Sequence, residues 1–189
     1  MLAASCSAPM LLQLHLGCGT KHLPAPWINL DSDPDVCPNV VDDIRTLASV
    51  APASVGAIYA CHVLEHVGRR EWQAVLAVWA SKLASGAILR ISVPDFAAVA
   101  SRYLAAGNIE EVMGLVVGGQ RNAADFHAVI FDAALLTAGL HAAGFHDVVP
   151  WDWRAMPHAH IDDYSQAYLP HMDKDHGMQM SLNLQATRN

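Results

Sequence analysis

The sequence is poor in charged residues, and in positive charge in particular. Asp, Glu, Lys and Arg make up 15% of its 189 residues, and 11 Lys and Arg stand against 18 Asp and Glu. The basic residues form no cluster, which argues against a nucleic-acid-binding protein. A hydrophobic content of 53% excludes a disordered chain. No run of about 18 apolar residues occurs, so we expect no membrane span.

Cysteine is scarce and has no ligand-like spacing. The four cysteines are Cys6, Cys18, Cys37 and Cys61, and no two of them form a CxxC pair. A zinc knuckle or a thioredoxin-like motif is therefore unsupported, and we expect reduced thiols in a cytoplasmic protein. The opening residues resemble a secretion signal only faintly, because they lack a basic segment and a separate apolar region.

Short apolar runs alternate with helical patterns along the whole chain. This alternation is typical of an α/β domain with a mostly parallel sheet, and the length suits a single domain. The apolar runs, each of which we expect to form a strand, cover residues 10–16, 27–30, 40–41, 57–61, 87–93, 145–151 and 181–186.

Two helices are predicted between these strands by apolar residues at helical spacing. In residues 72–83 the apolar positions fall at i, i+3, i+4, i+7, i+8 and i+11, and Gly86 follows as the expected stop. Residues 96–104 repeat the pattern, with Asp95 as the N-cap and Gly107 just after the helix end.

The second half of the chain is less regular. Residues 132–143 predict a further helix, capped by Asp132 and ended by Gly144. Residues 107–127 contain several glycines and allow no clear assignment. Residues 152–180 are polar and rich in His and Asp, so we expect a long excursion before the last strand.

A glycine turn follows the first predicted strand, and an acid ends the second. Gly17-Cys18-Gly19 lets the backbone approach a ligand closely, and Asp31 can accept from both hydroxyls of a ribose. A dinucleotide fingerprint would need a third glycine, where His22 stands, and a helix in residues 20–26, which contain two prolines. S-adenosylmethionine has no phosphate to place at a helix N-terminus, so it fits better than NAD; a plain tight turn is the alternative.

Five motifs in order, LHLGCG, WINLD, VDDI, AIYACHVLEH and ILRISVPD, cover residues 11–95. With them the chain resembles the class I S-adenosylmethionine-dependent methyltransferases, in particular a small bacterial subgroup described only as predicted methyltransferases. The resemblance continues more weakly through HAVIFD, LHAAGF and SLNL. It implies a Rossmann-like three-layer sandwich with helices on both faces of a seven-stranded, mostly parallel sheet of order 3-2-1-4-5-7-6, the last strand antiparallel. The whole chain, 1–189, would be one domain, with a donor-binding half at 10–95 and an acceptor-side half at 96–189.

The resemblance also implies donor-binding roles for residues in these motifs. They are Gly17, Cys18 and Gly19 beside the methionine moiety, Asp31 on the ribose diol, Asp43 and Ile44 at the adenine, Cys61, His62 and Val63 around the sulfonium, and His66, which with Glu65 completes the LEH signature. Asp42 competes with Asp43 for the adenine role.

Three positions depart from the family pattern. His15 stands where an acid usually orients the donor's ammonium, Ala84-Ser85-Gly86 replaces a proline and two glycines, and Gly56 replaces an Asp. These departures concern donor binding more than the fold.

The acceptor side offers two catalytic candidates. A base is needed only for an acceptor that loses a proton, and His127 and Asp95 are the candidates; the alternatives are a backbone-bonded histidine and a plain helix cap. Tyr103 lies on an apolar stripe, so we expect it in the core. An Asn/Asp-Pro-Pro-Tyr element is missing, which disfavours methylation of adenine or glutamine nitrogens.

Histidine and aspartate in residues 158–176 invite a metal site, but their spacing matches no defined ligand set. We therefore expect no metal there. The segment could instead close over the cleft or contact a second subunit, so a homodimer is one alternative. 

The sequence thus predicts a methyltransferase that uses S-adenosylmethionine, releases S-adenosylhomocysteine and acts on a small molecule or glycan. A glycan or a carrier-bound intermediate is the acceptor we favour. A degenerate methyltransferase fold serving as a binding or scaffold protein is the alternative, and a nicotinamide-dependent oxidoreductase is a third.

Overall fold

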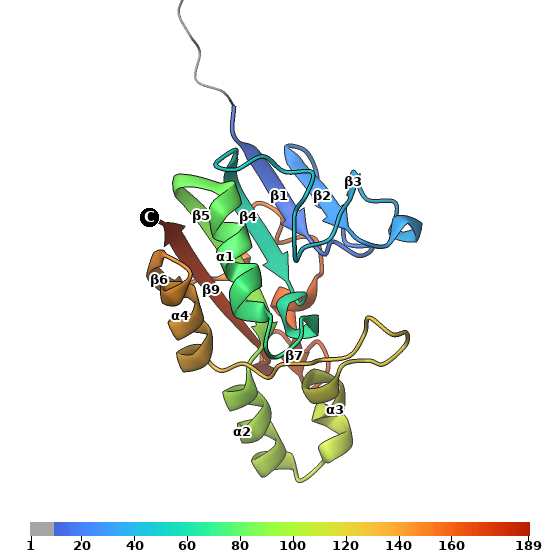
Figure 1. Cartoon of the computed structure of the whole chain (residues 1–189). Helices are drawn as coiled ribbons and strands as arrows, with labels where there is room; N and C mark the ends of the chain where they lie inside the picture. Colours follow the sequence, from blue (N-terminus) through green and yellow to red (C-terminus); the bar gives the residue numbers. More distant parts are fainter. Residues whose placement is uncertain (1–9) are drawn as a thin grey trace, which may run out of the picture.

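The computed structural model describes residues 10–189, which contain one seven-stranded sheet (Figure 1). The strands follow the order β3-β2-β1-β4-β5-β9-β6. In this sheet β9 alone runs opposite to the other six strands. The predicted strand order and the antiparallel last strand are therefore confirmed. The strands are β1 Leu12–Leu16, β2 Trp27–Asp31, β3 Val40–Val41, β4 Val55–Cys61, β5 Leu83–Pro94, β6 Phe145–Pro150 and β9 Ser181–Arg188.

Four α-helices lie within the described residues: α1 Trp72–Lys82, α2 Phe96–Ala106, α3 Ile109–Val117 and α4 Ala133–Ala142. The predicted caps are present. The Asp95 carboxylate accepts from the backbone N–H of Ala97, Gly107 follows α2 at φ 65°, and Asp132 caps α4 by accepting from Leu135. The segment that the sequence left unassigned contains α3.

The end of α1 differs from the expectation. The helix ends at Lys82, and Gly86, predicted to stop it, lies inside β5 at φ 77°. The cause is strand pairing: buried Leu83 already pairs with Val55 of β4, and the register shifts before Ala57 pairs with Ile88. Gly86 therefore serves an irregularity in the strand, where its positive φ is tolerated without a Cβ.

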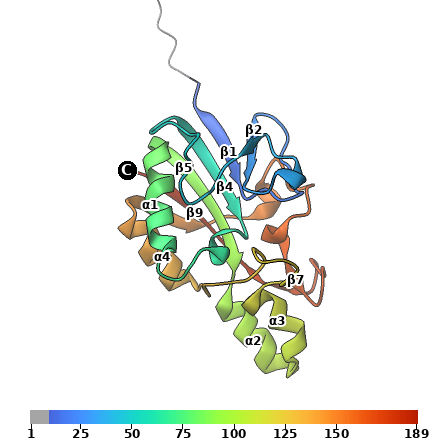
Figure 2. The same cartoon turned by 45° about the vertical axis from the view of Figure 1, so that its right-hand side comes forward.

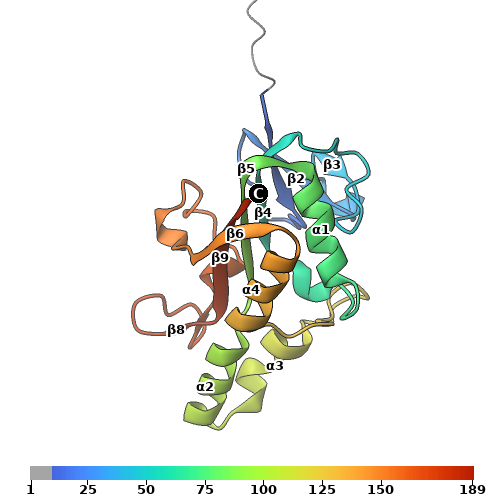
Figure 3. The same ribbon diagram turned by 60° about the vertical axis from the view of Figure 1, so that its left-hand side comes forward.

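The two faces of the sheet are covered differently. Helices α1 and α4 pack on one face (Figure 3), and Trp72 and Trp79 of α1 belong to the core there. The other face is covered by residues 151–180, which form short 3-10 turns and a hairpin of β7 Tyr168–Leu169 and β8 Met178–Gln179. Helices were expected on both faces. Irregular chain makes this third layer, because the β1–β2 connection with Pro24 and Pro26 forms no helix.

Helices α2 and α3 project beyond the carboxyl ends of the parallel strands (Figures 1 and 2). They are joined by an ion pair of Arg102 and Glu111, with 2.6 Å between Nη2 and Oε1. Ligands in open α/β sheets bind at this edge, and here α3 forms part of the wall of the cavity at this edge. Among residues 10–189, no helix combines the length and the apolar character needed to cross a bilayer.

Candidate functional site

A cavity of about 900 Å³ opens at the carboxyl ends of β1 and β4. This volume lies within the range of small-molecule sites. The predicted site residues that line the cavity are Gly17, Cys18, Gly19, Cys61, His62, His66 and His127. The far wall comes from α3 and the loop after it, and from residues 162–172.

Backbone conformation and packing explain why both ends of the turn after β1 are glycine. Gly17 has φ 61°, and a Cβ there would overlap the side chain of Val63. Gly19 has φ 48°, and a Cβ would meet nothing within 4 Å. Gly17 is thus required by both packing and conformation, whereas Gly19 is required by conformation alone. Val63 packs against the turn at Gly17 and does not line the cavity.

Asp31 ties the turn to the end of β2. Its Oδ2 accepts from the N–H of Gly19 at 2.8 Å, and its Oδ1 accepts from the N–H of Asp33 at 3.0 Å. Asp31 is half-buried and lies next to the lining rather than in it. A carboxylate has about four lone-pair positions, so each oxygen keeps acceptor capacity for a hydroxyl.

His15 lines the cavity where the family carries an acid. Its Nδ1–H donates to Oδ1 of Asn29 at 3.0 Å, because the amide nitrogen of Asn29 donates to Leu23 and Asn39. Burial lowers the pKa of His15 to about 4. The residue is therefore a neutral imidazole at pH 7, and only its Nε2 lone pair remains available.

The LEH signature places a buried carboxylate at the end of β4. Glu65 lies in a 3-10 turn, Leu64–His66, and is 0% exposed. Its Oε1 is 3.2 Å from Nδ1 of His62 and 4.0 Å from Nε2 of His127. Burial raises the pKa of Glu65 to about 8 and lowers that of His62 to about 3.

His127 reaches this carboxylate from the loop after α3. The N–H of Ala128 donates to the carbonyl of Glu65 at 2.7 Å, which fixes the loop against the 3-10 turn. The Nδ1–H of His127 donates to the carbonyl of Leu115, and its ring centroid lies 4.9 Å from that of His66. Burial lowers the pKa of His127. The structure thus gathers His62, His66 and His127 around Glu65.

Asp43 and Ile44 lie apart from the cavity lining. The Asp43 carboxylate forms a bidentate pair with Arg45, at 2.9 Å from Oδ2 to Nε and 2.7 Å to Nη2, and this partner lowers its pKa. The carbonyl of Ile44 accepts from the indole N–H of Trp79. Asp42, the other candidate for the adenine contact, accepts hydrogen bonds from Ser49 and Ala48.

Neither Asp95, which precedes α2, nor Tyr103, which lies within it, lines the cavity. Asp95 caps the helix, the alternative that the sequence left open, and it is absent from the lining. Tyr103, expected in the core, is 43% exposed. That expectation is wrong because α2 projects beyond the sheet, so only Val99 of this helix is fully buried.

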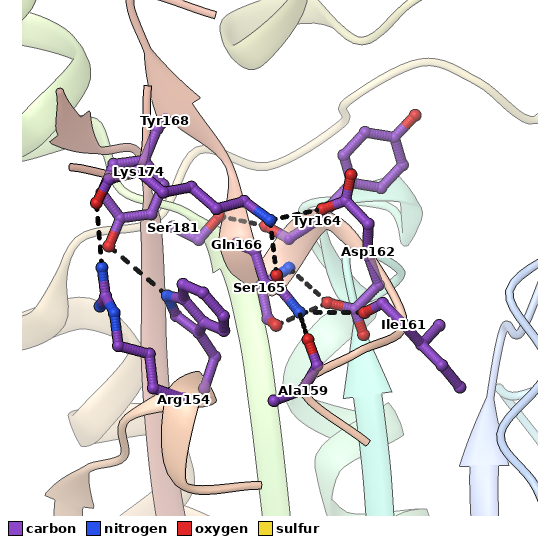
Figure 4. A network of polar contacts seen from close by, with 12 residues as sticks. Arg154, Ala159, Ile161, Asp162, Tyr164, Ser165, Gln166, Tyr168, Lys174 and Ser181 are labelled. Atoms are coloured by element: carbon purple, nitrogen blue, oxygen red, sulfur yellow. Dashed lines mark hydrogen bonds and ion pairs between the residues drawn. The ribbon is translucent and has the colours of Figure 1, made fainter. Parts of the chain in front are cut away.

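The segment before β9 forms the outer wall of the cavity, held by a polar network (Figure 4). Oγ of Ser181 donates to the carbonyl of Tyr164, and the Gln166 amide donates to the carbonyls of Ala159 and Ile161. Nζ of Lys174 bridges Oδ1 of Asp162 and Oε1 of Gln166. Asp162, Asp163 and Tyr164 line the cavity.

Comparison with known proteins gives structural matches only. No protein-family model and no curated protein sequence matches the chain. An S-adenosylmethionine-dependent methyltransferase from Archaeoglobus fulgidus is 15% identical, with a TM-score of 0.58 over 94% of this chain and 86% of that one. One from Thermotoga maritima is 12% identical, with a TM-score of 0.63 over 99% and 86%. The fold is that of the S-adenosylmethionine-dependent methyltransferases.

The methyltransferase fold also serves another kind of protein. The [4+2]-cyclase SpnF is 14% identical to this chain, with a TM-score of 0.53 over 94% of it and 75% of SpnF. The fold therefore leaves the reaction to be argued from the site.

Sequence reasoning named Glu65 only as a member of the LEH signature and gave it no part in the site. The available signal was an acid and a histidine directly after a buried strand, at the edge where ligands bind. It also missed the pair of Tyr59 and Asp163, whose phenol and carboxylate lie 2.6 Å apart in the interior. No local pattern links residues so far apart in the chain.

Proposed function

We propose that this protein is an S-adenosylmethionine-dependent methyltransferase. The observation that carries the proposal is the cavity at the carboxyl ends of β1 and β4, lined by Gly17–Gly19 and by Cys61 and His62 in a methyltransferase fold. Residues 10–95 would hold the donor, and residues 96–189 would select the acceptor. S-adenosylhomocysteine would be the product.

The residues present fit this donor. The Gly19 turn leaves open space where a Cβ would stand, and no helix begins after it to bind a pyrophosphate. Asp31 keeps acceptor capacity for the ribose hydroxyls. Cys18 and Cys61 place polarizable sulfur atoms in the lining of the cavity. The Nε2 lone pair of His15 is available to the ammonium group of the donor. Asp43 and Ile44 would approach the adenine if Asp43 shares its carboxylate between Arg45 and the base.

The donor supplies a methyl group on a positively charged sulfur, and the protein's task is to position the acceptor in line with it. Tyr164, Arg121 and Asn122 give the acceptor side of the cavity a polar character. A glycan or a carrier-bound small molecule is the acceptor class we favour for this open and polar wall. Nε2 of His127 is the base candidate, because its Nδ1–H is committed to Leu115; Asp95, as a helix cap, is the weaker one.

A binding protein with a degenerate methyltransferase fold is the second candidate. His15 favours it, because the neutral imidazole brings no negative charge to the donor's ammonium. The two readings differ in whether the donor binds at all.

Thermal unfolding with S-adenosylmethionine, S-adenosylhomocysteine or NAD tests the proposal. A ligand at about 100 times its Kd adds ~2.7 kcal/mol, which moves Tm by roughly 5–10 °C for a chain of this size. We expect both sulfur ligands to shift Tm, NAD to have no effect, and Asp31→Asn to reduce the shift. Asp147→Asn is the matched control, because that side chain is 77% exposed and lies in β6 at the sheet edge.

If neither sulfur ligand shifts the Tm of protein that melts cooperatively, the result favours the binding protein over the methyltransferase. A shift with NAD alone would favour an oxidoreductase.

A further inference from the structure

Three side chains on one wall of the cavity bring metal-ligating atoms together. One ligand atom each of Glu65, His66 and His127 lies within 4.8 Å of the other two. His66 and His127 both line the cavity, and Glu65 is buried next to them. This cluster is separate from the His- and Asp-rich segment at 158–176 that the sequence offered as a metal candidate.

The hydrogen bonds of the two histidines fix which ring nitrogen carries the proton. Nδ1 of His66 lies 3.1 Å from the carbonyl of Phe126, and Nδ1 of His127 lies 3.0 Å from the carbonyl of Leu115. A carbonyl only accepts, so both Nδ1 atoms carry the proton and both Nε2 atoms present a lone pair. Histidines that bind metals are oriented in this way, with the second N–H donated to a carbonyl or carboxylate.

Glu65 has no donor to satisfy it. Neither carboxylate oxygen has a hydrogen-bond partner among the described residues, although the side chain is completely buried. His62 does not supply one: its Nε2–H donates to Oγ of Ser181, whose own proton goes to the carbonyl of Tyr164. Nδ1 of His62 therefore turns a lone pair toward Glu65 as well.

When Glu65 is ionised, as a metal-binding carboxylate must be, it and the lone pairs of His62, His66 and His127 face one another with no proton between them. Buried polar groups are normally paired, and an unpaired buried carboxylate is among the most costly groups to keep. A cation would satisfy the Glu65 carboxylate and the Nε2 lone pairs of His66 and His127 at once.

We propose that Glu65, His66 and His127 bind one divalent transition-metal ion, with its open coordination positions turned toward the cavity. Two imidazoles and one carboxylate form a ligand set of zinc and non-haem iron sites. The imidazoles favour such an ion over Mg²⁺ or Ca²⁺, which prefer oxygen ligands.

Such an ion also indicates the class of acceptor, an inference that rests on the proposed methyltransferase function. An acceptor hydroxyl oxygen on an open coordination position would lose its proton to cleft water, since a divalent ion lowers the pKa of a bound oxygen. The oxygen lone pair would then form the O–CH₃ bond while the S–CH₃ bond breaks and its electron pair stays on sulfur. The acceptor class is an alcohol or phenol, and His127 would act as a ligand in place of a base.

Titration of the chelator-treated protein with Zn²⁺, followed by calorimetry, tests the site, and Co²⁺ with its visible absorption reports the geometry. We expect one equivalent to bind, and both Glu65→Gln and His127→Gln to weaken binding at least about 100-fold, the upper end of what loss of a supporting partner costs. Glu110→Gln and His176→Gln are matched controls on exposed side chains and should bind like the wild type.

Glu65→Gln keeps the shape and adds an N–H that can donate to His62, so it should fold; His127→Gln provides a second variant if it does not. Binding of Zn²⁺ that is unchanged in these variants, or absent altogether, would overturn the proposal. Metal binding is measured without the donor, and the donor-induced Tm shift without the metal. A donor-induced Tm shift without Zn²⁺ binding would refute the metal site alone. Zn²⁺ binding without a donor-induced Tm shift would refute the methyltransferase function alone.

Discussion

The phenol of Tyr59 donates a hydrogen bond to Oδ2 of Asp163 over 2.6 Å, in the interior between β4 and the outer wall of the cavity. Asp163 also accepts at Oδ1 from the N–H and the hydroxyl of Ser165. This one carboxylate therefore joins the sheet to the segment that lines the cavity. Its neighbours Asp162 and Tyr164 face the cavity itself.

Replacement of Tyr59 by Phe should destabilise the protein by about 1–3 kcal/mol, because the buried carboxylate loses a charge-assisted partner. The free energy of unfolding in urea measures this change, and Tm should fall by roughly 2–4 °C per kcal/mol. Tyr103→Phe, on a 43% exposed ring, is the matched control and should change little. Equal stability of the two variants would mean that the bond contributes nothing net.

The stability of the protein should depend on pH through His15. Its pKa is lowered by burial to about 4, against 6.5 in the unfolded chain. The unfolded state thus binds more protons between these values, so the free energy of unfolding is largest above pH 6.5 and falls as the pH drops toward 4. The full loss from this one residue is about 3 kcal/mol.

Urea unfolding of His15→Gln at several pH values measures the contribution as a difference from the wild type. The variant should lose this part of the slope between pH 6.5 and 4. His176→Gln, whose side chain is 87% exposed, should keep it. A wild-type slope in the His15 variant would show that the imidazole is not held neutral by the fold.

Gly17 and Gly19 should respond differently to alanine. Gly17→Ala combines a positive φ with an overlap on Val63, whereas Gly19→Ala meets open space and carries only the backbone strain, of about 1–2 kcal/mol. We expect the Gly17 variant to be clearly the less stable in urea unfolding. Adding Val63→Ala should restore part of the loss at Gly17 and none at Gly19, since only the first pair is coupled. Additive effects in both pairs would contradict the packing account.

The adenine role can be assigned by comparing Asp43→Asn with Asp42→Asn. The Asp43 pair with Arg45 is exposed at both ends, so its loss should change stability by less than about 1 kcal/mol. If Asp43 contacts the donor's adenine, its variant should weaken S-adenosylmethionine binding about tenfold, equivalent to ~1.4 kcal/mol. Asp42→Asn should instead loosen the turn at Ser49 and leave the affinity nearly unchanged. The opposite pattern in ligand titrations would move the role to Asp42.

Local signals in the sequence determined the sheet, the caps and the glycine turn. Short apolar runs and period-3.6 patterns depend on neighbouring residues, so strands such as β4 and β5 and the caps Asp95 and Asp132 were predictable. The helix α3 escaped prediction because Gly114 lies within it and Gly118 and Gly119 follow it, and glycines read as loop residues.

The tertiary structure alone decided which side chains meet at the site. His127 was named as a candidate base, but its contact with Glu65 depends on the loop after α3 and on the hydrogen bond from the N–H of Ala128 to the carbonyl of Glu65. Likewise, Asp95 had the chemistry of a catalytic base and the position of a cap, and its placement at the start of α2 left it outside the cavity. The sequence determines where the strands end, because periodicity is local; loop closure decides what gathers there, because it joins residues that share no local pattern.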